Sequence, residues 1–366
     1  MLRQGRDSTR MREIGTLNRS LSMFQVDRPT TLINFPNTIH VSIPDTLSNC
    51  GNLGLPIISG WSYRCVTPLN LRNTNGTGWI PVDFTTMFQG SPLASLPVDP
   101  VNTVASGAFY VFVTDGRSWT FASLLESERH APSAARDGGT DFARFEAGNN
   151  LSLWTSASGL VGYWSFDEGT GTTARDLSGR GNTGTLVNNP TWTTGQVGGA
   201  LSFDGVDDFV NVGIGTHYFP LPRFTICSWN RTPGLAPGRT QNGFFSLTFG
   251  LIHFLNSSGQ FSIWIDDGTT LHPFAVTPDN LHNNQWHHLC SIFDGTHLHM
   301  FVNGISRRSD PFAWQGTTRH PTSGVHVGIN SNNLAVWIFN GLIDEVRIYN
   351  RALTEAEIRA NFNATR

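Results

Sequence analysis

The sequence predicts a mainly β protein built from antiparallel sheets, with one amphipathic helix near its start. Between residues 160 and 212, apolar and polar side chains alternate in short runs that are separated by Gly, Asn and Asp. This pattern is typical of antiparallel strands joined by tight turns. No segment between residues 160 and 350 shows a clear helical period. The low share of charged residues, 14%, and the 38 glycines fit a chain rich in strands and loops.

Length and charge limit the possible classes of protein. A chain of 366 residues predicts two domains, and a hydrophobic fraction of 39% is enough for packed cores. The net charge of −3 predicts neither a nucleic-acid partner nor an acidic lipid surface. The sequence contains no run of 18 apolar residues and shows no signal peptide, so no membrane-spanning segment is expected.

The first predicted element is a helix over residues 6–26. Its apolar side chains recur in steps of three and four, which places them on one stripe of a helix: Met11, Ile14, Leu17, Leu21 and Phe24. The opposite face is rich in Arg, Ser and Thr. The helix is expected to end before Pro29, because proline cannot continue it.

Residues 30–150 then change to a pattern of strands and loops. Residues 107–127 predict a hairpin, with two apolar strands on either side of a turn at residues 114–117. Cys50 and Cys65 enclose a loop that a disulfide would stabilise by about 3 kcal/mol. The even number of cysteines, 4, indicates an oxidising compartment.

The second half of the chain resembles a laminin G-like domain of the concanavalin A-like lectin/glucanase superfamily. The strings that carry this resemblance are YWSFDEGTGTTARDLSGRGNTGTL, GGALSFDGVDDFVNV, FTICSWNRT, NQWHHLCSIFDGTHLHMFVNG and FNGLIDEVRIYNRALTEAEIRANF. The resemblance implies an antiparallel β-sandwich of jelly-roll type over residues 160–366. Residues 151–159 form a short linker before it.

The first 150 residues resemble the soluble domain of a type IV pilin-like protein of the pseudopilin class. A helix followed by GWIPVDF, SPLASLPVDPVN, a YVFV strand and DGGTDFARFEAG carries this resemblance. It implies an α+β domain in which the helix packs on an antiparallel sheet. Members of that family begin with an apolar, membrane-embedded half-helix, which this chain lacks. A late gene start or a truncation would explain the difference, and membrane attachment would depend on that missing helix.

Pentraxins belong to the same superfamily and carry a disulfide between two strands with similar strings. The resemblance therefore implies a Cys227–Cys290 bridge, since these cysteines lie in FTICSW and HHLCSIF. The alternative is two buried free thiols, which are common in protein cores.

Relatives in this superfamily often hold one structural calcium ion that ties the first strand to the last. The residues here that match that role are Asp176, Asn182 and Asp344, together with backbone carbonyl groups. The alternative is that these residues only shape turns, as Asp and Asn often do.

The sequence predicts no catalytic residue. Glycoside cleavage needs two converging carboxylates, and the glucanase pattern of alternating acids on one strand is absent. Asp344 and Glu345 are adjacent and are expected to point to opposite faces of a strand. The histidines at 287, 288, 297 and 299 have no hydrolase motif around them.

Binding in this superfamily uses exposed aromatic and amide side chains on loops or on one sheet face. The candidates are Trp264, Trp337 and Asn332, with Trp314, Asn330 and Asn333 as further members. The alternative for the tryptophans is a place in the core of the sandwich.

The sequence therefore predicts a non-catalytic binding protein on the bacterial cell surface or a pilus. Its expected partners are glycans or extracellular proteins, and other pilins for the first domain. Two alternatives stay open: a structural minor pilin or pseudopilin of a type IV pilus or type II secretion system, and a glycoside hydrolase.

Overall fold

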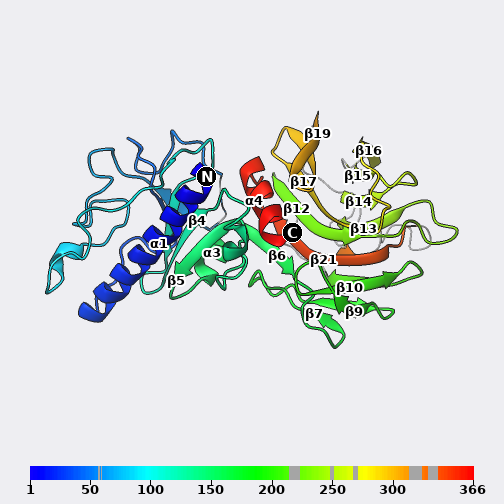
Figure 1. The fold of residues 1–366 in the computed structure, drawn as a ribbon, viewed down its shortest axis with the longest axis horizontal. Helices are drawn as coiled ribbons and strands as arrows, with labels where there is room; N and C mark the ends of the chain where they lie inside the picture. Colours follow the sequence, from blue (N-terminus) through cyan, green and yellow to red (C-terminus); the bar gives the residue numbers. More distant parts are fainter. Residues whose placement is uncertain are drawn as a thin grey trace. The chain divides into compact units, whose positions relative to one another are not determined.

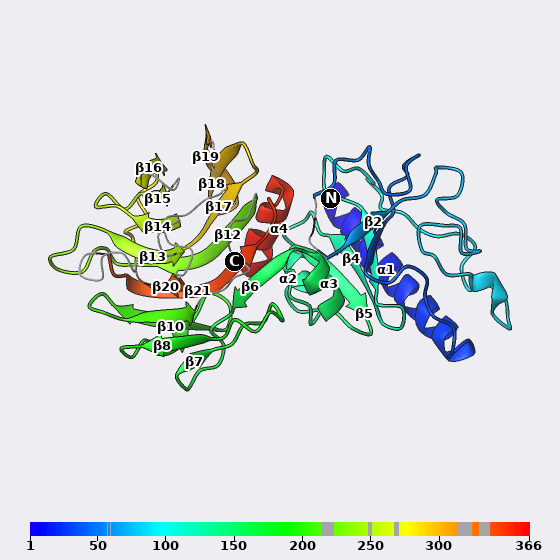
Figure 2. The ribbon, with the colours of Figure 1, turned by 180° about the vertical axis from the view of Figure 1, so that it is seen from behind.

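The computed structural model divides into two compact units. It describes the chain except residues 57, 59, 214–222, 248–250, 267–270, 313–323 and 329–336, and the side chains of residues 156, 266 and 271–275. The first unit comprises Met1–Gly159 and Thr354–Thr365, and the second comprises Leu160–Leu353 and Arg366. Figures 1 and 2 show the ribbon from opposite sides.

The first unit contains a five-stranded sheet with strand order β2-β1-β3-β4-β5. The pairing is antiparallel except between β1 and β2, which run parallel. The elements are α1 (Leu2–Asp27), β1 (Thr38–Val41), β2 (Ser62–Arg64), the 3₁₀ turn η1 (Phe84–Thr86), β3 (Tyr110–Thr114), β4 (Trp119–Leu124), α2 (Ala131–Ala134), β5 (Arg144–Gly148), α3 (Ser152–Ala157) and α4 (Glu355–Thr365). The β3–β4 hairpin confirms the predicted turn at residues 114–117.

The helix α1 packs its predicted apolar stripe on one face of this sheet. Ile14, Leu17, Leu21 and Phe24 are buried in one core cluster with aromatic side chains of β3 and β4. The opposite face of the sheet packs against α3, because Val111 and Val113 cluster with Trp154 and Ala157. Alternation along β3 therefore supplies two cores, one for each face.

Arg10 is a buried charge at the N-terminal part of α1. Its side chain is fully buried, yet it forms ion pairs with Asp99 at 2.6 Å, with Asp7 at 2.8 Å and with Glu126. A buried guanidinium is tolerated only when carboxylates satisfy its charge and its fixed donor geometry. This network ties α1 to the loop after η1 and to the end of β4.

The last helix, α4, belongs to the first unit rather than to the domain over 160–366 that the sequence predicts. Ala360 packs with Leu124 and Ala143. Glu357 accepts a hydrogen bond from Arg144 at 3.5 Å and caps its own helix by accepting from the backbone N–H of Thr354 at 2.9 Å. These contacts lie far apart in sequence, which is why the boundary was not visible in local patterns.

The second unit is formed by two eight-stranded sheets, in keeping with the predicted antiparallel β-sandwich. The β21 sheet has the order β19-β18-β17-β12-β21-β10-β9, with β6 also paired to β21, and the β14 sheet has the order β16-β15-β14-β13-β20-β11-β8-β7. The strands of the β21 sheet are β6 (Leu160–Trp164), β9 (Thr191–Thr194), β10 (Gly199–Asp204), β12 (Phe224–Arg231), β17 (Trp286–Phe293), β18 (His297–Val302), β19 (Ile305–Pro311) and β21 (Asn340–Tyr349). Those of the β14 sheet are β7 (Thr173–Ala174), β8 (Gly184–Val187), β11 (Phe209–Gly213), β13 (Asn242–Leu247), β14 (Leu251–Leu255), β15 (Phe261–Asp266), β16 (Leu271–Val276) and β20 (Val325–Val327).

One continuous apolar core fills the space between these two sheets. Ile226 and Ile343 from the β21 sheet share it with Leu251 and Ile263 from the β14 sheet. His253 lies among these apolar side chains, 1% exposed, and its Nε2 atom is 2.8 Å from the hydroxyl of Ser291 on β17. Burial lowers the pKa of His253 to about 3, so the ring is neutral at physiological pH.

Both predicted disulfides are present. Cys50 and Cys65 close the loop in the first unit, with their Cα atoms 5.2 Å apart. Cys227 and Cys290 face each other directly on β12 and β17, with Cα atoms 4.2 Å apart. The described part of the chain contains no helix that is both long and apolar enough to cross a membrane.

We predict that Asp99→Ala destabilises the first unit by about 3 to 5 kcal/mol, because it leaves Arg10 buried without its bidentate partner. Denaturant unfolding measures this change. Glu355→Ala is the matched control, since its pair with Arg359 is more than half exposed and is expected to contribute less than about 1 kcal/mol. Equal effects of the two substitutions would contradict the structural role of Arg10.

We predict that His253 makes the second unit less stable in acid. Its pKa in the folded state, about 3, lies below the ordinary value of 6.5, so between these pH values the unfolded chain binds the extra proton. This contribution is complete above pH 6.5 and is lost as the pH falls toward 3. The free energy of unfolding of wild type should therefore drop relative to that of His253→Gln across this window. A pH-independent difference would show that His253 does not titrate as the structure requires.

Candidate functional site

An aromatic cluster lies on the outward face of the β14 sheet. Ile263 and Ile265 of β15 point into the core, so Trp264 between them points outward. Its neighbour across the ladder is Ile252 of β14. Ile252, Phe254 and Trp337 form a separate hydrophobic cluster with Trp264 packed against it.

The rings of this cluster are in direct contact. The centroids of Trp264 and Trp337 are 4.6 Å apart with the planes at 77°, and Phe254 lies 5.8 Å from Trp264 and 5.3 Å from Trp337. Trp337 is 9% exposed, whereas Trp264 is half-buried. The structure therefore brings together two of the predicted binding residues. The third, Asn332, lies outside the described residues, as do Trp314, Asn330 and Asn333.

The chemistry of this cluster is suited to contact rather than to turnover. Edge-to-face aromatic rings form a rigid apolar platform with few degrees of freedom. A half-exposed indole can cover the apolar face of a sugar ring or the side chain of a protein partner.

Asp176 and Asn182, two of the predicted calcium ligands, form a turn network. One Asp176 oxygen accepts hydrogen bonds from the backbone N–H groups of Tyr163 and Ser178, and the other accepts from Asn182. The side chain of Asn182 donates to the carbonyl of Val161 at 3.1 Å. Both residues thus hold the loop after β6 against that strand, and no hydrogen bond joins either of them to Asp344.

Asp344, the third predicted ligand, is fully buried in β21. Its Oδ2 atom accepts hydrogen bonds of 2.9 Å from the backbone N–H groups of Gln196 and Val197. Its Oδ1 atom is also buried and has no hydrogen-bond partner. Burial and the charge of Glu345 raise the pKa of Asp344 to about 9.

The segment over residues 195–199 is held between two carboxylates. Asp344 binds its middle, and Asp167, which follows β6, accepts from the N–H of Gly199 at 2.6 Å. A Cβ atom on Gly195 would lie 2.0 Å from the carbonyl oxygen of Gly199 and 2.6 Å from Asp344 Oδ2. Glycine is required there because backbone and carboxylate occupy the space of a side chain.

Glu345 lies on the same side of β21 as Asp344, which corrects the expectation that these two acids point to opposite faces. Ile343 and Val346 both enter the core although they are three positions apart, which a regular strand does not permit. A bulge between β12 and β21, with Glu345 at φ +55°, accommodates the extra residue.

The Glu345 carboxylate is held by two neighbouring side chains. It accepts hydrogen bonds from the hydroxyl of Tyr163 at 3.1 Å and from Arg347 at 2.5 Å. Burial raises the pKa of Glu345 to about 7, against the opposing charge of Arg347. Glu345 is 2% exposed, so this group of charges is internal.

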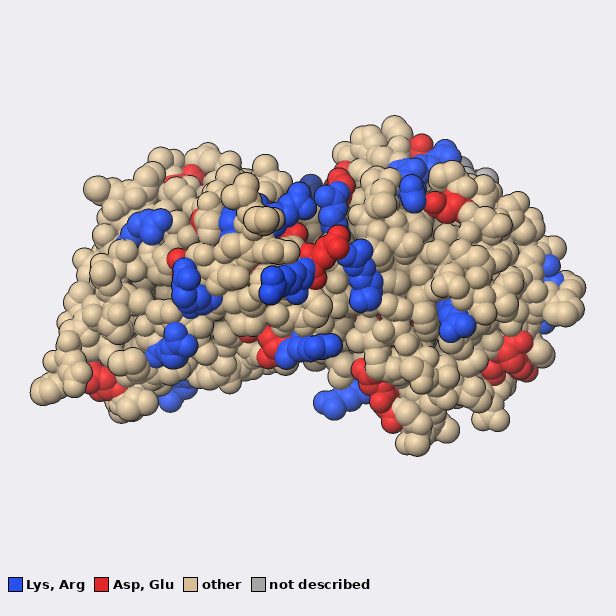
Figure 3. All heavy atoms as spheres, viewed as in Figure 1, with Lys and Arg blue, Asp and Glu red and all other residues tan. Residues whose placement is uncertain are grey.

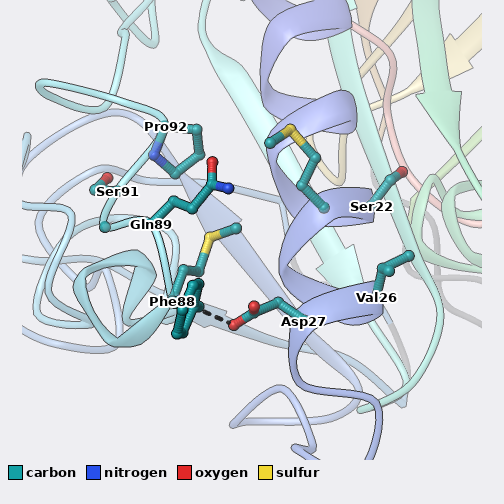
Figure 4. A pocket seen from close by; sticks show the side chains of 10 residues that line it. Ser22, Val26, Asp27, Phe88, Gln89, Ser91 and Pro92 are labelled. Carbon is teal, nitrogen blue, oxygen red and sulfur yellow. Dashed lines mark hydrogen bonds between the residues drawn. The ribbon is translucent and has the colours of Figure 1, made fainter.

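The first unit carries an apolar groove of about 550 Å³ between the end of α1 and residues 87–92. Val26 and Phe88 on its walls are 83% and 90% exposed. Figure 4 shows a hydrogen bond across it, from the N–H of Phe88 to Asp27 at 3.3 Å.

The surface carries charges of both signs. On the face drawn in Figure 3, acidic and basic side chains lie close together and most of the surface is uncharged. This mixture agrees with the small net charge of −3.

A family comparison identifies the second unit. Residues 204–359 match the profile of the concanavalin A-like lectin/glucanases superfamily, Laminin_G_3. The β-sandwich carries a domain of this superfamily. The predicted lectin-like domain is thereby confirmed over residues 204–359, whereas the pilin-like identity of the first unit stays a prediction.

Several solved structures match part of this chain at low sequence identity. Domain 4 of AbnA, an extracellular GH43 arabinanase of Geobacillus stearothermophilus solved with arabinotriose, is 21% identical, with a TM-score of 0.45 over 55% of this chain and 97% of that domain. The binding domain of Paraclostridial Mosquitocidal Protein 1 is 16% identical, with a TM-score of 0.44 over 56% of this chain and 52% of that one. The structure of botulinum neurotoxin type C, whose cell entry depends on two ganglioside molecules, is 12% identical, with a TM-score of 0.44 over 57% and 52%.

The chain thus spans about half the length of the two toxin chains. No functional conclusion follows from similarities of this size. No curated protein is similar enough in sequence to match this chain.

Sequence reasoning missed three residues that the structure joins to these sites. Phe254 completes the aromatic platform, and alternation in LIHFL, with Leu251 and Leu255 inside, could have placed it outward. Asp167 and Glu345 surround Asp344 through a bulge and a long-range strand pairing. No local pattern in the sequence signals such a bulge.

We predict that Gly195→Ala destabilises the second unit by about 1 to 3 kcal/mol, because its methyl group would overlap Asp344 and the Gly199 carbonyl. Thermal unfolding measures the change. Gly15→Ala in α1 is the control with the opposite sign, since its nearest neighbour is 3.8 Å away and alanine favours helix by about 0.5 to 1 kcal/mol. A neutral Gly195→Ala would contradict the tight fit around Asp344.

Proposed function

We propose that the second unit is a non-catalytic binding module that recognises a carbohydrate or an extracellular protein through its aromatic platform. The platform consists of Trp264, Trp337 and Phe254. The observation that carries this proposal is the contact between the two indoles, of which Trp264 is half-buried and Trp337 is buried, on the outward face of a sheet. A structural tryptophan of the sandwich would face the core, where the apolar residues of both sheets meet.

Two further features support an extracellular setting. The chain forms two disulfides, which persist in oxidising compartments. The superfamily of the second unit includes lectins by its own description. Attachment to the surface of a bacterium is part of this proposal.

The second unit contains two carboxyl groups whose pKa values are raised. Both are buried, and their burial supports the absence of catalysis. Two acids with separated pKa values, about 9 for Asp344 and about 7 for Glu345, are the usual signature of an acid–base pair. Here they are 0% and 2% exposed and bonded to the protein itself, so a glycoside could not reach them. For this reason, a glycoside hydrolase of the glucanase type is less favoured than a binding module.

Calcium is part of the proposal at Asp344. The buried Oδ1 atom without a partner fits a cation, because a lone acceptor in the interior needs either a proton or a positive charge. Asp167 and Asp344 would supply carboxylate oxygens there, and the role would be to fix the segment between them. Asp176 and Asn182 fit a turn network better than this site.

The packing of α1 favours a second candidate function for the first unit. A 26-residue helix with an apolar stripe along a largely antiparallel sheet is the arrangement that a pilin-like domain would have. In that case the first unit would be a minor pilin or pseudopilin that presents the second unit and contacts other pilins. Copurification of this chain with filaments would support that role.

We predict that Trp264→Ala weakens binding of the full chain on a glycan array by at least roughly tenfold, because it removes the half-buried indole of the platform. The array is run with calcium and again with a chelator, so that a metal requirement is measured separately. Trp286→Ala is the matched control, since this half-buried tryptophan begins β17 in the other sheet.

Unchanged binding by Trp264→Ala, with the variant shown to be folded, would remove the platform from recognition. If wild type binds no glycan under either condition, the carbohydrate branch of the proposal fails and a protein ligand takes its place.

A further inference from the structure

Three carboxylates meet at the connection where the chain passes from one sheet of the sandwich to the other. Asp204 ends β10 in the β21 sheet, and β11 of the β14 sheet begins directly after Asp208. Oxygen atoms of Asp204, Asp207 and Asp208 all lie within 4.8 Å of one another. Asp204 and Asp207 are exposed, and Asp208 is 4% exposed.

The backbone of this connection is fixed independently of the carboxylates. Gly205 has φ +77°, and a Cβ atom there would lie 2.7 Å from the Cβ of Ala236. The carbonyl oxygens of Val206 and Asp207 accept hydrogen bonds from Arg239 at 3.0 Å and from Asn188 at 2.9 Å. The three acids are therefore held in place by contacts that do not neutralise them.

Their oxygen atoms are incompletely satisfied. Asp208 Oδ2 accepts from the N–H of Asp204 at 3.0 Å, and Asp204 Oδ1 accepts from Val206 at 2.8 Å. Asp208 Oδ1 is buried and has no hydrogen-bond partner among the described residues. None of the three carboxylates forms an ion pair with a described side chain, and Arg239 nearby binds a backbone carbonyl instead.

Holding these three carboxylates together costs free energy unless a positive charge lies between them. A buried acceptor that lacks a donor forfeits its hydration, and like charges at this spacing repel. Burial, together with the charges of Asp204 and Asp207, raises the pKa of Asp208 to about 6. The exposure of Asp204 and Asp207 leaves room for water to complete a coordination shell.

We propose that Asp204, Asp207 and Asp208 bind a calcium ion that braces the crossing between the two sheets. Calcium takes six to eight oxygen ligands at about 2.4 Å in irregular geometry, so its ligands lie up to roughly 4.8 Å apart across the ion. Magnesium demands a near-ideal octahedron with shorter bonds, and zinc favours nitrogen and sulfur ligands. The site is distinct from the one proposed at Asp344 and does not depend on ligand binding by the aromatic platform.

The test is calorimetric titration of the full chain with calcium chloride after removal of metal, together with thermal unfolding with calcium and with chelator. Wild type should bind calcium with a dissociation constant at the sub-millimolar to millimolar level typical of extracellular modules, and calcium should raise its Tm.

Asp207→Asn should weaken calcium binding at this site on the order of tenfold, because it loses one ligand charge. Its Tm in chelator should match wild type, since the Asp207 side chain makes no hydrogen bond with any described residue. Asp310→Asn, on the exposed strand β19, is the control and should change neither value.

Two further variants decide between the sites. Asp208→Asn should also lose binding, and Asp344→Asn should retain binding at Asp204, Asp207 and Asp208. Unchanged affinity in Asp207→Asn, or no heat of binding by wild type at millimolar calcium, overturns the proposal. Loss of the only calcium site in Asp344→Asn, with Asp207→Asn unaffected, overturns it equally and assigns the ion to Asp344.

Discussion

The pairing of two different strands along one edge of β21 is the constraint on which the second unit depends. β10 pairs with its first half and β6 with its second half. The bulge at Asp344 and Glu345 lies at the junction, and Asp344 accepts the backbone N–H groups of the incoming segment. The Asp344 side chain thus satisfies backbone N–H groups that have no strand partner between β6 and β10. The glycine at 195 follows from the same contact, since a Cβ atom there would overlap the Asp344 carboxylate.

Both units use buried polar groups within otherwise apolar cores, and they do so differently. Arg10 brings a full charge into the first unit and is matched by three carboxylates. His253 stays neutral in the second unit and bonds to one hydroxyl of the opposite sheet. The first arrangement depends on complete pairing, while the second depends on the absence of protonation. Each fixes how a helix or a sheet lies on its neighbour, because a misplaced partner would leave a buried group unsatisfied.

The acidic residues of the second unit show why local patterns are ambiguous about function. From the sequence, Asp176 and Asp344 were each compatible with a turn or with a metal ligand. In the structure the two oxygens of Asp176 are fully engaged by backbone donors, whereas Asp344 and Asp208 each retain a buried oxygen without a partner. These aspartates differ in how many backbone N–H groups a distant segment of the chain donates to them. Which segment lies close enough to donate depends on strand order, and a short stretch of sequence does not determine strand order.

The sequence by itself determined the periodic features of this protein. Alternation gave the antiparallel strands, steps of three and four gave the stripe of α1, and family strings gave the lectin-like domain and the Cys227–Cys290 bridge. Only the tertiary structure decided which residues from distant strings meet. It brought Trp264, Trp337 and Phe254 into one cluster, gathered Asp167 and Glu345 around Asp344, and moved α4 to the first unit. Periodicity records which face of an element is apolar, but the partner of that face is set by long-range pairing and packing.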